Sequence, residues 1–136
     1  MIVVDTGPLI ALFDPRDGLH IECRTRLERL REPLVTTLPV LTEAFHILGP
    51  ESRGSQNLRL LIEKGGLSVH YSNDAGLVRA FELMETYSDH PMDLADASVV
   101  AAAEAVGTRK VFTVDRGDFE TYRIRRGHRH HAVHIV

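Results

Sequence analysis

The 136-residue sequence predicts a three-layer α/β/α sandwich with a central, mostly parallel sheet of four to five strands. Short apolar runs alternate with longer segments of helical periodicity, as in strands joined by crossover helices. No repeat, low-complexity tract or long linker divides the chain, so residues 1–136 are expected to form a single domain. With 43% hydrophobic and 26% charged residues, the composition is that of a globular domain that buries a core without staples.

The first half of the sequence begins with a buried strand at residues 1–4, ended by Asp5. Residues 9–13 suit one or two helical turns, and residues 17–31 predict an amphipathic helix because Leu19, Cys23, Leu27 and Leu30 recur at helical spacing. A second brief strand is expected at residues 34–36. Thr37 and Pro39 then open a helix over residues 37–48, which Gly49-Pro50 ends.

The second half continues the same alternation. Further strands are predicted at residues 67–70, 110–114 and 132–136. Further helices are predicted at residues 55–64, after a cap at Asn73 or Asp74, and over the alanine-rich residues 93–106 that Gly107 closes.

The compartment and the charge follow from composition. One cysteine, Cys23, forms no internal disulfide, which favours a reducing environment. The apolar run at residues 2–4 is too short for a signal-peptide core or a membrane span, so we expect a cytoplasmic protein without membrane association. The net charge of -3 argues against a general polyanion binder. Residues 123–131, however, are rich in arginine and histidine and contain no acid, so positive charge is concentrated there.

Two acids follow predicted strands directly: Asp5 and Asp115. The carboxyl ends of neighbouring parallel strands form one crevice, which is where open α/β sheets bind ligands. The structural alternative is that each acid forms a turn or caps the next helix. Two such acids in one chain favour a site.

Three further acids belong to predicted helices. Glu43 lies beside the apolar face of its helix and is the only charge within residues 36–43, although a solvated glutamate is the structural alternative. Asp93 and Asp96 are one turn apart at a helix start, where Asp93 is also a candidate N-cap and Asp96 its capping-box partner. The alanines that follow allow close approach to the sheet, which would direct Asp96 toward the crevice.

Four carboxylates in one pocket repel each other, and a hard divalent cation relieves that repulsion. Mg²⁺ or Mn²⁺ prefers oxygen ligands and bridges carboxylates to a substrate phosphate. The sequence therefore predicts a Mg²⁺ or Mn²⁺ site.

The order of four motifs resembles PIN-domain proteins of the VapC type, and the resemblance covers almost the whole chain. The motifs are Val4-Asp5-Thr6-Gly7-Pro8-Leu9, then Leu41-Thr42-Glu43, then Asp93-Leu94-Ala95-Asp96-Ala97-Ser98, then Phe112-Thr113-Val114-Asp115-Arg116-Gly117-Asp118-Phe119. Each motif alone is weak, but four in this order are specific.

The resemblance implies a PIN-like fold and a Mg²⁺- or Mn²⁺-dependent endoribonuclease, the toxin of a type II toxin–antitoxin pair. Such enzymes are commonly homodimers and are silenced by a cognate antitoxin. The implied catalytic and metal-binding residues are Asp5, Glu43, Asp96 and Asp115. The implied accessory residues are Asp93 and Asp118, together with Thr6 and Thr113, which would hold the carboxylates by hydrogen bonds. Between the two neighbouring acids, we assign the metal ligand to Asp96 rather than Asp93.

RNA binding requires positive charge near the acids. The candidates are Arg116, Arg123, Arg125 and Arg126; the structural alternative is a solvated loop before the last strand. A competing functional hypothesis is a non-catalytic PIN-like module that binds RNA or protein. A phosphoacceptor or phosphatase domain is disfavoured, because Asp5 is followed by Thr6-Gly7-Pro8 and Lys110 precedes its strand.

Overall fold

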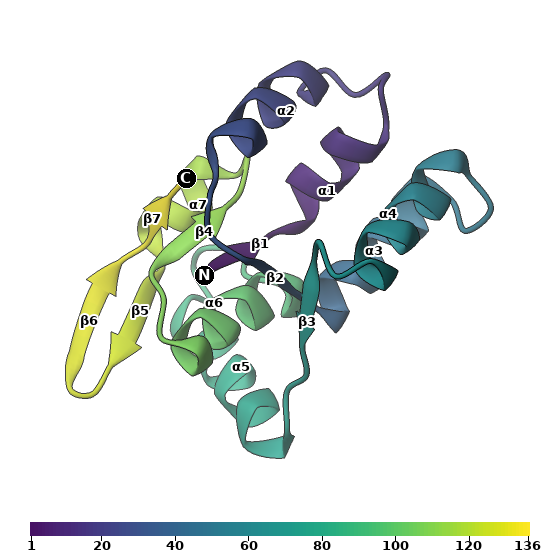
Figure 1. Cartoon of the computed structure of the whole chain (residues 1–136). Coiled ribbons are helices and arrows are strands. Elements are labelled where there is room, and N and C mark those ends of the chain that lie inside the picture. Colours follow the sequence, from purple (N-terminus) through teal and green to yellow (C-terminus); the bar gives the residue numbers. More distant parts are fainter.

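The computed structural model describes all residues, 1–136, and has the predicted three-layer architecture (Figure 1). Five parallel strands form the central sheet in the order β3-β2-β1-β4-β7. These strands are β1 (Ile2–Val4), β2 (Leu34–Thr37), β3 (Ser68–His70), β4 (Lys110–Phe112) and β7 (His134–Ile135). The prediction of a mostly parallel sheet with up to five strands is confirmed.

The strand order reverses beside β1. The chain runs outward from β1 to β2 and β3, then crosses to the other side of β1 to form β4 and β7. Val3 pairs with both Val35 and Val111, so β1 is the central strand. A crevice outside the carboxyl ends of β1 and β4 is therefore the expected ligand site of this topology.

Seven helices surround the sheet (Figure 1). They are α1 (Thr6–Phe13), α2 (His20–Arg29), α3 (Leu38–Leu48), α4 (Arg53–Glu63), α5 (Asp74–Thr86), α6 (Leu94–Val106) and α7 (Arg116–Thr121). Helices α1 to α4 lie on one side of the sheet, and α5 and α6 lie on the other. None of them has the length and apolar character needed to cross a lipid bilayer.

The core lies where α6 packs against the sheet. Val3, Val111 and Phe112 are fully buried, as are Ala97 and Ala103 on α6. Small side chains let a helix approach a sheet closely, which confirms the expectation drawn from the alanine-rich sequence. Gly107 ends α6 in the left-handed conformation (φ 75°), where a glycine has no steric penalty.

Three elements were not predicted, namely two strands and one short helix. The arginine- and histidine-rich segment forms an antiparallel hairpin of β5 (Arg123–Arg126) and β6 (Arg129–Ala132), so the alternative description of it as a solvated loop was wrong. Ala132 belongs to β6 rather than to the last strand. The six-residue helix α7 also escaped prediction, because so short a segment has no readable periodicity.

Candidate active site

Six acidic side chains line one cavity outside the carboxyl ends of β1 and β4. The cavity has a volume of about 430 Å³. Its lining comprises Asp5, Glu43, Asp93, Asp96, Asp115 and Asp118, together with Thr6, Gly7, Pro91 and Val114. The structure thus brings the four acids of the predicted quartet together with both predicted accessory acids.

Asp5 lies at the end of β1, deepest among the acids, with 6% of its surface exposed. Its side chain makes no capping hydrogen bond to α1, so the helix-cap explanation does not account for it. Instead its carboxylate accepts a hydrogen bond from Thr113 Oγ1 at 2.8 Å. Burial raises the pKa of Asp5 from 3.8 to about 6, against the opposing effect of hydrogen bonds from Thr6 and Thr113.

Thr113 connects the two strand ends that carry acids. Its hydroxyl donates to Asp5 and accepts from the backbone N–H of Asp115 at 3.0 Å. The backbone N–H of Asp5 in turn donates to the carbonyl of Phe112 at 2.9 Å. One buried threonine therefore fixes the position of Asp5 relative to the loop that carries Asp115.

Thr6 forms part of the cavity wall directly after Asp5. Its hydroxyl is buried and has no hydrogen-bond partner within the protein. A buried hydroxyl without a partner is costly, so this group is suited to bind a water or a ligand in the cavity. The expected hydrogen bond from the Thr6 hydroxyl to a carboxylate is therefore not formed, and it is the Thr6 backbone that lowers the pKa of Asp5.

Asp93 and Asp96 form a reciprocal capping box at the start of α6. Asp93 accepts from the Asp96 backbone N–H at 2.8 Å, and Asp96 accepts from the Asp93 backbone N–H at 3.3 Å. Both acids also line the cavity, so they serve structure and site together. Burial, then the charges of Asp93 and Asp5, raise the pKa of Asp96 from 3.8 to about 8.

Asp115 and Asp118 lie one turn apart at the start of α7. Asp115 is the N-cap, accepting from the Asp118 backbone N–H at 3.3 Å. Burial raises the pKa of Asp115, and contact with Asp118 raises it further. Asp118 Oδ1 lies 2.6 Å from His90 Nε2, but the geometry of this contact is not that of a hydrogen bond. With a protonated imidazole the two side chains would form an ion pair.

Glu43 reaches the cavity from the middle of α3, where it is half-buried. Thr37, the N-cap of α3, is joined to α6 through a hydrogen bond of 2.7 Å between its hydroxyl and that of Ser98. The negative charge of Glu43 contributes to the raised pKa of Asp5. The side chain is thus directed at the other acids rather than into open solvent.

Gly7 allows α1 to begin close to the loop after β4. A Cβ built on Gly7 would lie 2.4 Å from Val114 Cγ2, a distance that two carbon atoms cannot share. Both residues line the cavity. The absence of a side chain at Gly7 therefore sets how closely Asp5 and Asp115 approach each other.

The donor set suits a hard divalent cation. All six charged groups offer carboxylate oxygens, which Mg²⁺ and Mn²⁺ prefer, and neither cysteine nor histidine lines the cavity. No three of the side chains converge closely enough to form a preformed cluster. The raised pKa values of Asp5 and Asp96 fit carboxyl groups that would release protons on binding a cation.

The four predicted RNA-binding arginines are divided by the fold. Arg116 begins α7, next to Asp115 of the cavity. Arg123, Arg125 and Arg126 lie on β5 of the hairpin and do not line the cavity. The guanidinium of Arg123 donates to three carbonyls at the end of α7.

Sequence reasoning missed His90 and Pro91, which belong to the loop between α5 and α6. Their role depends on contacts distant along the chain: His90 contacts Asp118, and the Pro91 carbonyl accepts from the Tyr122 hydroxyl at 3.2 Å. No local pattern reveals such contacts. The position of His90 three residues before Asp93 was the only available signal.

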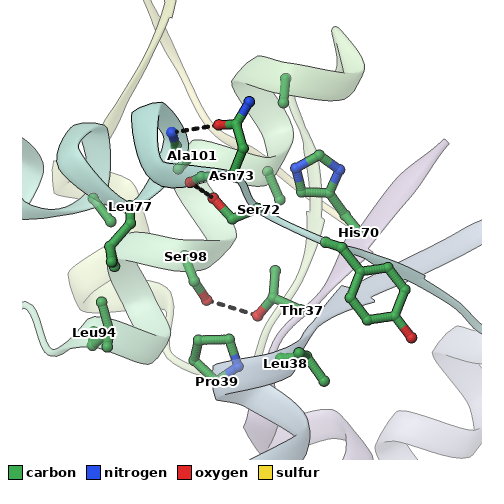
Figure 2. A pocket seen from close by; sticks show the side chains of 15 residues that line it. Thr37, Leu38, Pro39, His70, Ser72, Asn73, Leu77, Leu94, Ser98 and Ala101 are labelled. Carbon is green, nitrogen blue, oxygen red and sulfur yellow. Dashed lines mark hydrogen bonds between the residues drawn. The ribbon is translucent and has the colours of Figure 1, made fainter.

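A second cavity, of about 270 Å³, lies on the neighbouring side of the α3 N-terminus and contains no carboxylate (Figure 2). Figure 2 shows the Thr37 and Ser98 hydroxyls facing each other at its base, with Pro39, Leu77 and Leu94 around them. Leu38, Tyr71, Leu77 and Leu94 line it and remain exposed to solvent. Its chemistry is that of an apolar surface rather than of a metal site.

Acid-lined cavities at the switch point of a parallel sheet define a class of α/β domains suited to bind divalent cations. Residues 2–124 match the PIN domain family model, and the chain belongs to this family. It is 26% identical over 124 residues to Ribonuclease VapC26 of Mycobacterium tuberculosis, covering 90% of this chain and 92% of that protein.

Solved structures share the fold. The Mycobacterium tuberculosis toxin VapC20, described as cleaving the sarcin–ricin loop, superposes with a TM-score of 0.78 at 18% identity, over 85% of this chain and 91% of that one. A toxin–antitoxin complex from Klebsiella pneumoniae gives a TM-score of 0.70 at 21% identity, over 89% of this chain and 92% of that one.

Proposed function

We propose that this protein is an endoribonuclease that hydrolyses RNA phosphodiester bonds with Mg²⁺ or Mn²⁺, and that it is the toxin of a type II toxin–antitoxin pair. The observation that carries the proposal is the gathering of six carboxyl groups in one cavity at the β1–β4 switch point. Membership of the PIN domain family and similarity to a ribonuclease support the reaction class.

The residues that line the cavity have different roles in the proposed reaction. Asp5, Asp96 and Asp115 would hold the cation, and Thr113 keeps Asp5 in position through its hydroxyl. Glu43 would orient a ligand or a second ion in the same cavity, and Asp93 and Asp118 would add negative charge beside it. A bound Mg²⁺ or Mn²⁺ supplies an activated water and neutralises charge on the phosphodiester.

The alternative function is a non-catalytic PIN-like module that binds RNA or protein. Repulsion among six acids destabilises a fold that has no use for them, as the raised pKa values of Asp5 and Asp96 indicate. A binding module has no need of that cost. The six acids that line the cavity therefore favour the enzyme.

Cleavage of a labelled RNA tests the proposal. The purified protein should cut RNA in Mg²⁺ or Mn²⁺ and not in EDTA, and Asp5→Asn should lower the rate by about 100-fold or more. Glu63→Gln, an exposed acid on α4, is the matched control and should cleave normally. A folded Asp5→Asn protein with full activity, or a wild-type protein inactive with every cation, would support the alternative.

The proposed partner is an antitoxin protein. One structural neighbour is a toxin–antitoxin complex, and the match covers 89% of this chain. Cytoplasmic action is proposed with it, because the single cysteine is buried and has no partner for an internal disulfide. Co-expression with the product of a neighbouring small reading frame should yield a complex that no longer cleaves RNA.

We propose a homodimer that buries the apolar cavity of Figure 2. Exposed Leu38, Tyr71, Leu77 and Leu94 form a patch of the kind that marks protein interfaces. Leu77→Glu should convert the dimer to a monomer in size-exclusion chromatography with light scattering. Leu60→Glu, an exposed leucine on α4, is the control.

The four predicted RNA-binding arginines remain proposals with different support. Arg116 adjoins the acidic cavity, which places positive charge beside the reacting phosphate. Arg125 and Arg126 are exposed on the hairpin and form no ion pair, so they would attract RNA at a distance from the cavity. Arg123 has the least support as an RNA-binding residue, because its guanidinium already donates hydrogen bonds to backbone carbonyls.

A further inference from the structure

A basic groove adjoins the acidic cavity across the first turn of α7. It has a volume of about 540 Å³, and its charged wall consists of Arg26 and Arg29 from α2, Arg116 from α7, and one acid, Glu22. Asp115 lines the cavity and Arg116, the next residue, lines the groove. In Figure 1, α2 and α7 lie close together near the C-terminal end of the chain.

Arg26 is fixed as part of the groove wall. Its guanidinium donates to the carbonyl of Thr113 at 2.8 Å and to the carbonyl of Val136, and lies 4.8 Å from the centre of the Phe112 ring. The Thr113 side chain holds Asp5 in the acidic cavity. The groove is therefore joined rigidly to the strand end that carries the acids.

Two of the three arginines in the groove, Arg29 and Arg116, form no ion pair within the protein. Burial lowers the pKa of Arg26, and the nearby charge of Arg116 lowers it further. Arg24, on the same helix, pairs with Glu28, whereas none of the eight ion pairs includes Arg29 or Arg116. Arg26 is already bonded to the main-chain oxygens of Thr113 and Val136, so Arg29 and Arg116 are the guanidinium groups of the groove that are left to bind an anion.

We propose that this groove binds a backbone phosphate of the RNA strand, adjacent to the phosphodiester held in the acidic cavity. The inference rests on the proposed nuclease function. Arginine is suited to this ligand because its planar guanidinium donates two parallel hydrogen bonds to phosphate oxygens. Arg29 and Arg116 bind the phosphate directly, and Arg26 positions the groove and contributes its charge.

Salt-dependent RNA binding tests the groove. The parent protein is Asp5→Asn, which blocks cleavage, and fluorescence anisotropy measures its Kd for a labelled single-stranded RNA over a salt series. Adding Arg29→Glu or Arg116→Glu should weaken binding and lower the slope of log K against log salt by about 0.7 for each lost phosphate contact. Arg24→Glu makes the same change of charge on the same helix outside the groove, and should leave the slope unchanged.

Each outcome has a distinct meaning. If wild-type protein cleaves RNA but Arg29→Glu and Arg116→Glu behave like Arg24→Glu, the groove does not bind RNA and only this inference is overturned. If the groove variants weaken binding of a protein partner and not of RNA, the anion is an acidic protein segment and the inference is also overturned. If wild-type protein cleaves no RNA with any cation, both the proposed function and the groove inference are overturned. Arg29→Ala, which keeps the fold less perturbed, should reproduce the loss of slope.

Discussion

At the scale of single residues, burial and hydrogen bonding give each acid a different character. Asp5 is almost wholly buried and held by Thr113, whereas Asp115 is exposed and caps α7. Asp96 is shared between a helix cap and the cavity. The same residue type thus provides one rigid carboxylate and several adaptable ones around it.

Replacing Thr113 tests the support of Asp5. Thr113→Val keeps the shape of the side chain but removes the hydroxyl that donates to Asp5 and accepts from Asp115 N–H. We expect activity to fall by about 10-fold or more, because a supporting hydrogen bond orients the ligand. Thr113→Ser should restore most of the activity, and equal losses for Val and Ser would contradict a hydrogen-bonding role.

Replacing Asp93 separates its two roles. Asp93→Ala removes both the cap of α6 and a carboxylate, and should lower the free energy of unfolding by about 1 kcal/mol. Asp93→Ser retains a capping oxygen, so its stability should approach that of the wild type. If Asp93 is accessory rather than a metal ligand, Asp93→Ser should also keep most of its RNA cleavage; an inactive but stable Asp93→Ser protein would make Asp93 a ligand.

At the scale of elements, the sequence predicted the helices and strands whose ends are marked by residues close by in the chain, such as caps and glycines. The helix expected at residues 93–106 forms from Leu94 to Val106, between the Asp93 cap and Gly107. The hairpin escaped because its charged residues follow no apolar alternation. It is held by Ile124 alone among β5 residues, whose burial depends on the tertiary fold.

The candidate site divides in the same way. Its acids were predictable because they follow strands or begin helices, positions that local patterns reveal. His90 and the basic groove were not, because both arise from segments far apart in sequence: His90 contacts Asp118, and Arg26 contacts Thr113. Contacts of this kind require the three-dimensional arrangement.

The junction between α1 and β4 depends on Gly7. Gly7→Ala would place a Cβ 2.4 Å from Val114 Cγ2, so one of the two elements must move. We expect the free energy of unfolding to fall by about 1–3 kcal/mol and cleavage to fall with it. Gly18→Ala, where a Cβ meets no atom within 4 Å, is the control for denaturant unfolding. Equal stability of the two variants would show that the close approach is unimportant.

At the scale of the whole molecule, the acidic cavity makes stability depend on pH and on cations. The folded protein raises the pKa of Asp5 to about 6 and of Asp96 to about 8, from 3.8. Protonation of these groups therefore favours the folded state. That contribution is complete below about pH 4 and is lost as the pH rises through the two raised values.

Denaturant unfolding in EDTA measures this effect. The free energy of unfolding should fall between about pH 4 and pH 8, with about 3 kcal/mol of the decrease due to Asp5. Asp5→Asn cannot ionise, so its stability should fall less over this range and exceed that of the wild type at the alkaline end. Mg²⁺ should restore wild-type stability there. A wild-type protein more stable at the alkaline end in EDTA would contradict the pKa values.

The central claim is that acids from β1, α3, α6 and the loop after β4 hold one divalent-cation site. Calorimetric titration with Mn²⁺ near neutral pH tests it most directly, using wild type, Asp5→Asn and the control Glu63→Gln. We predict saturable binding to the wild type and to Glu63→Gln, and binding weakened by about 10-fold or more in Asp5→Asn. Mn²⁺ binding by a folded Asp5→Asn protein with wild-type affinity would contradict the claim.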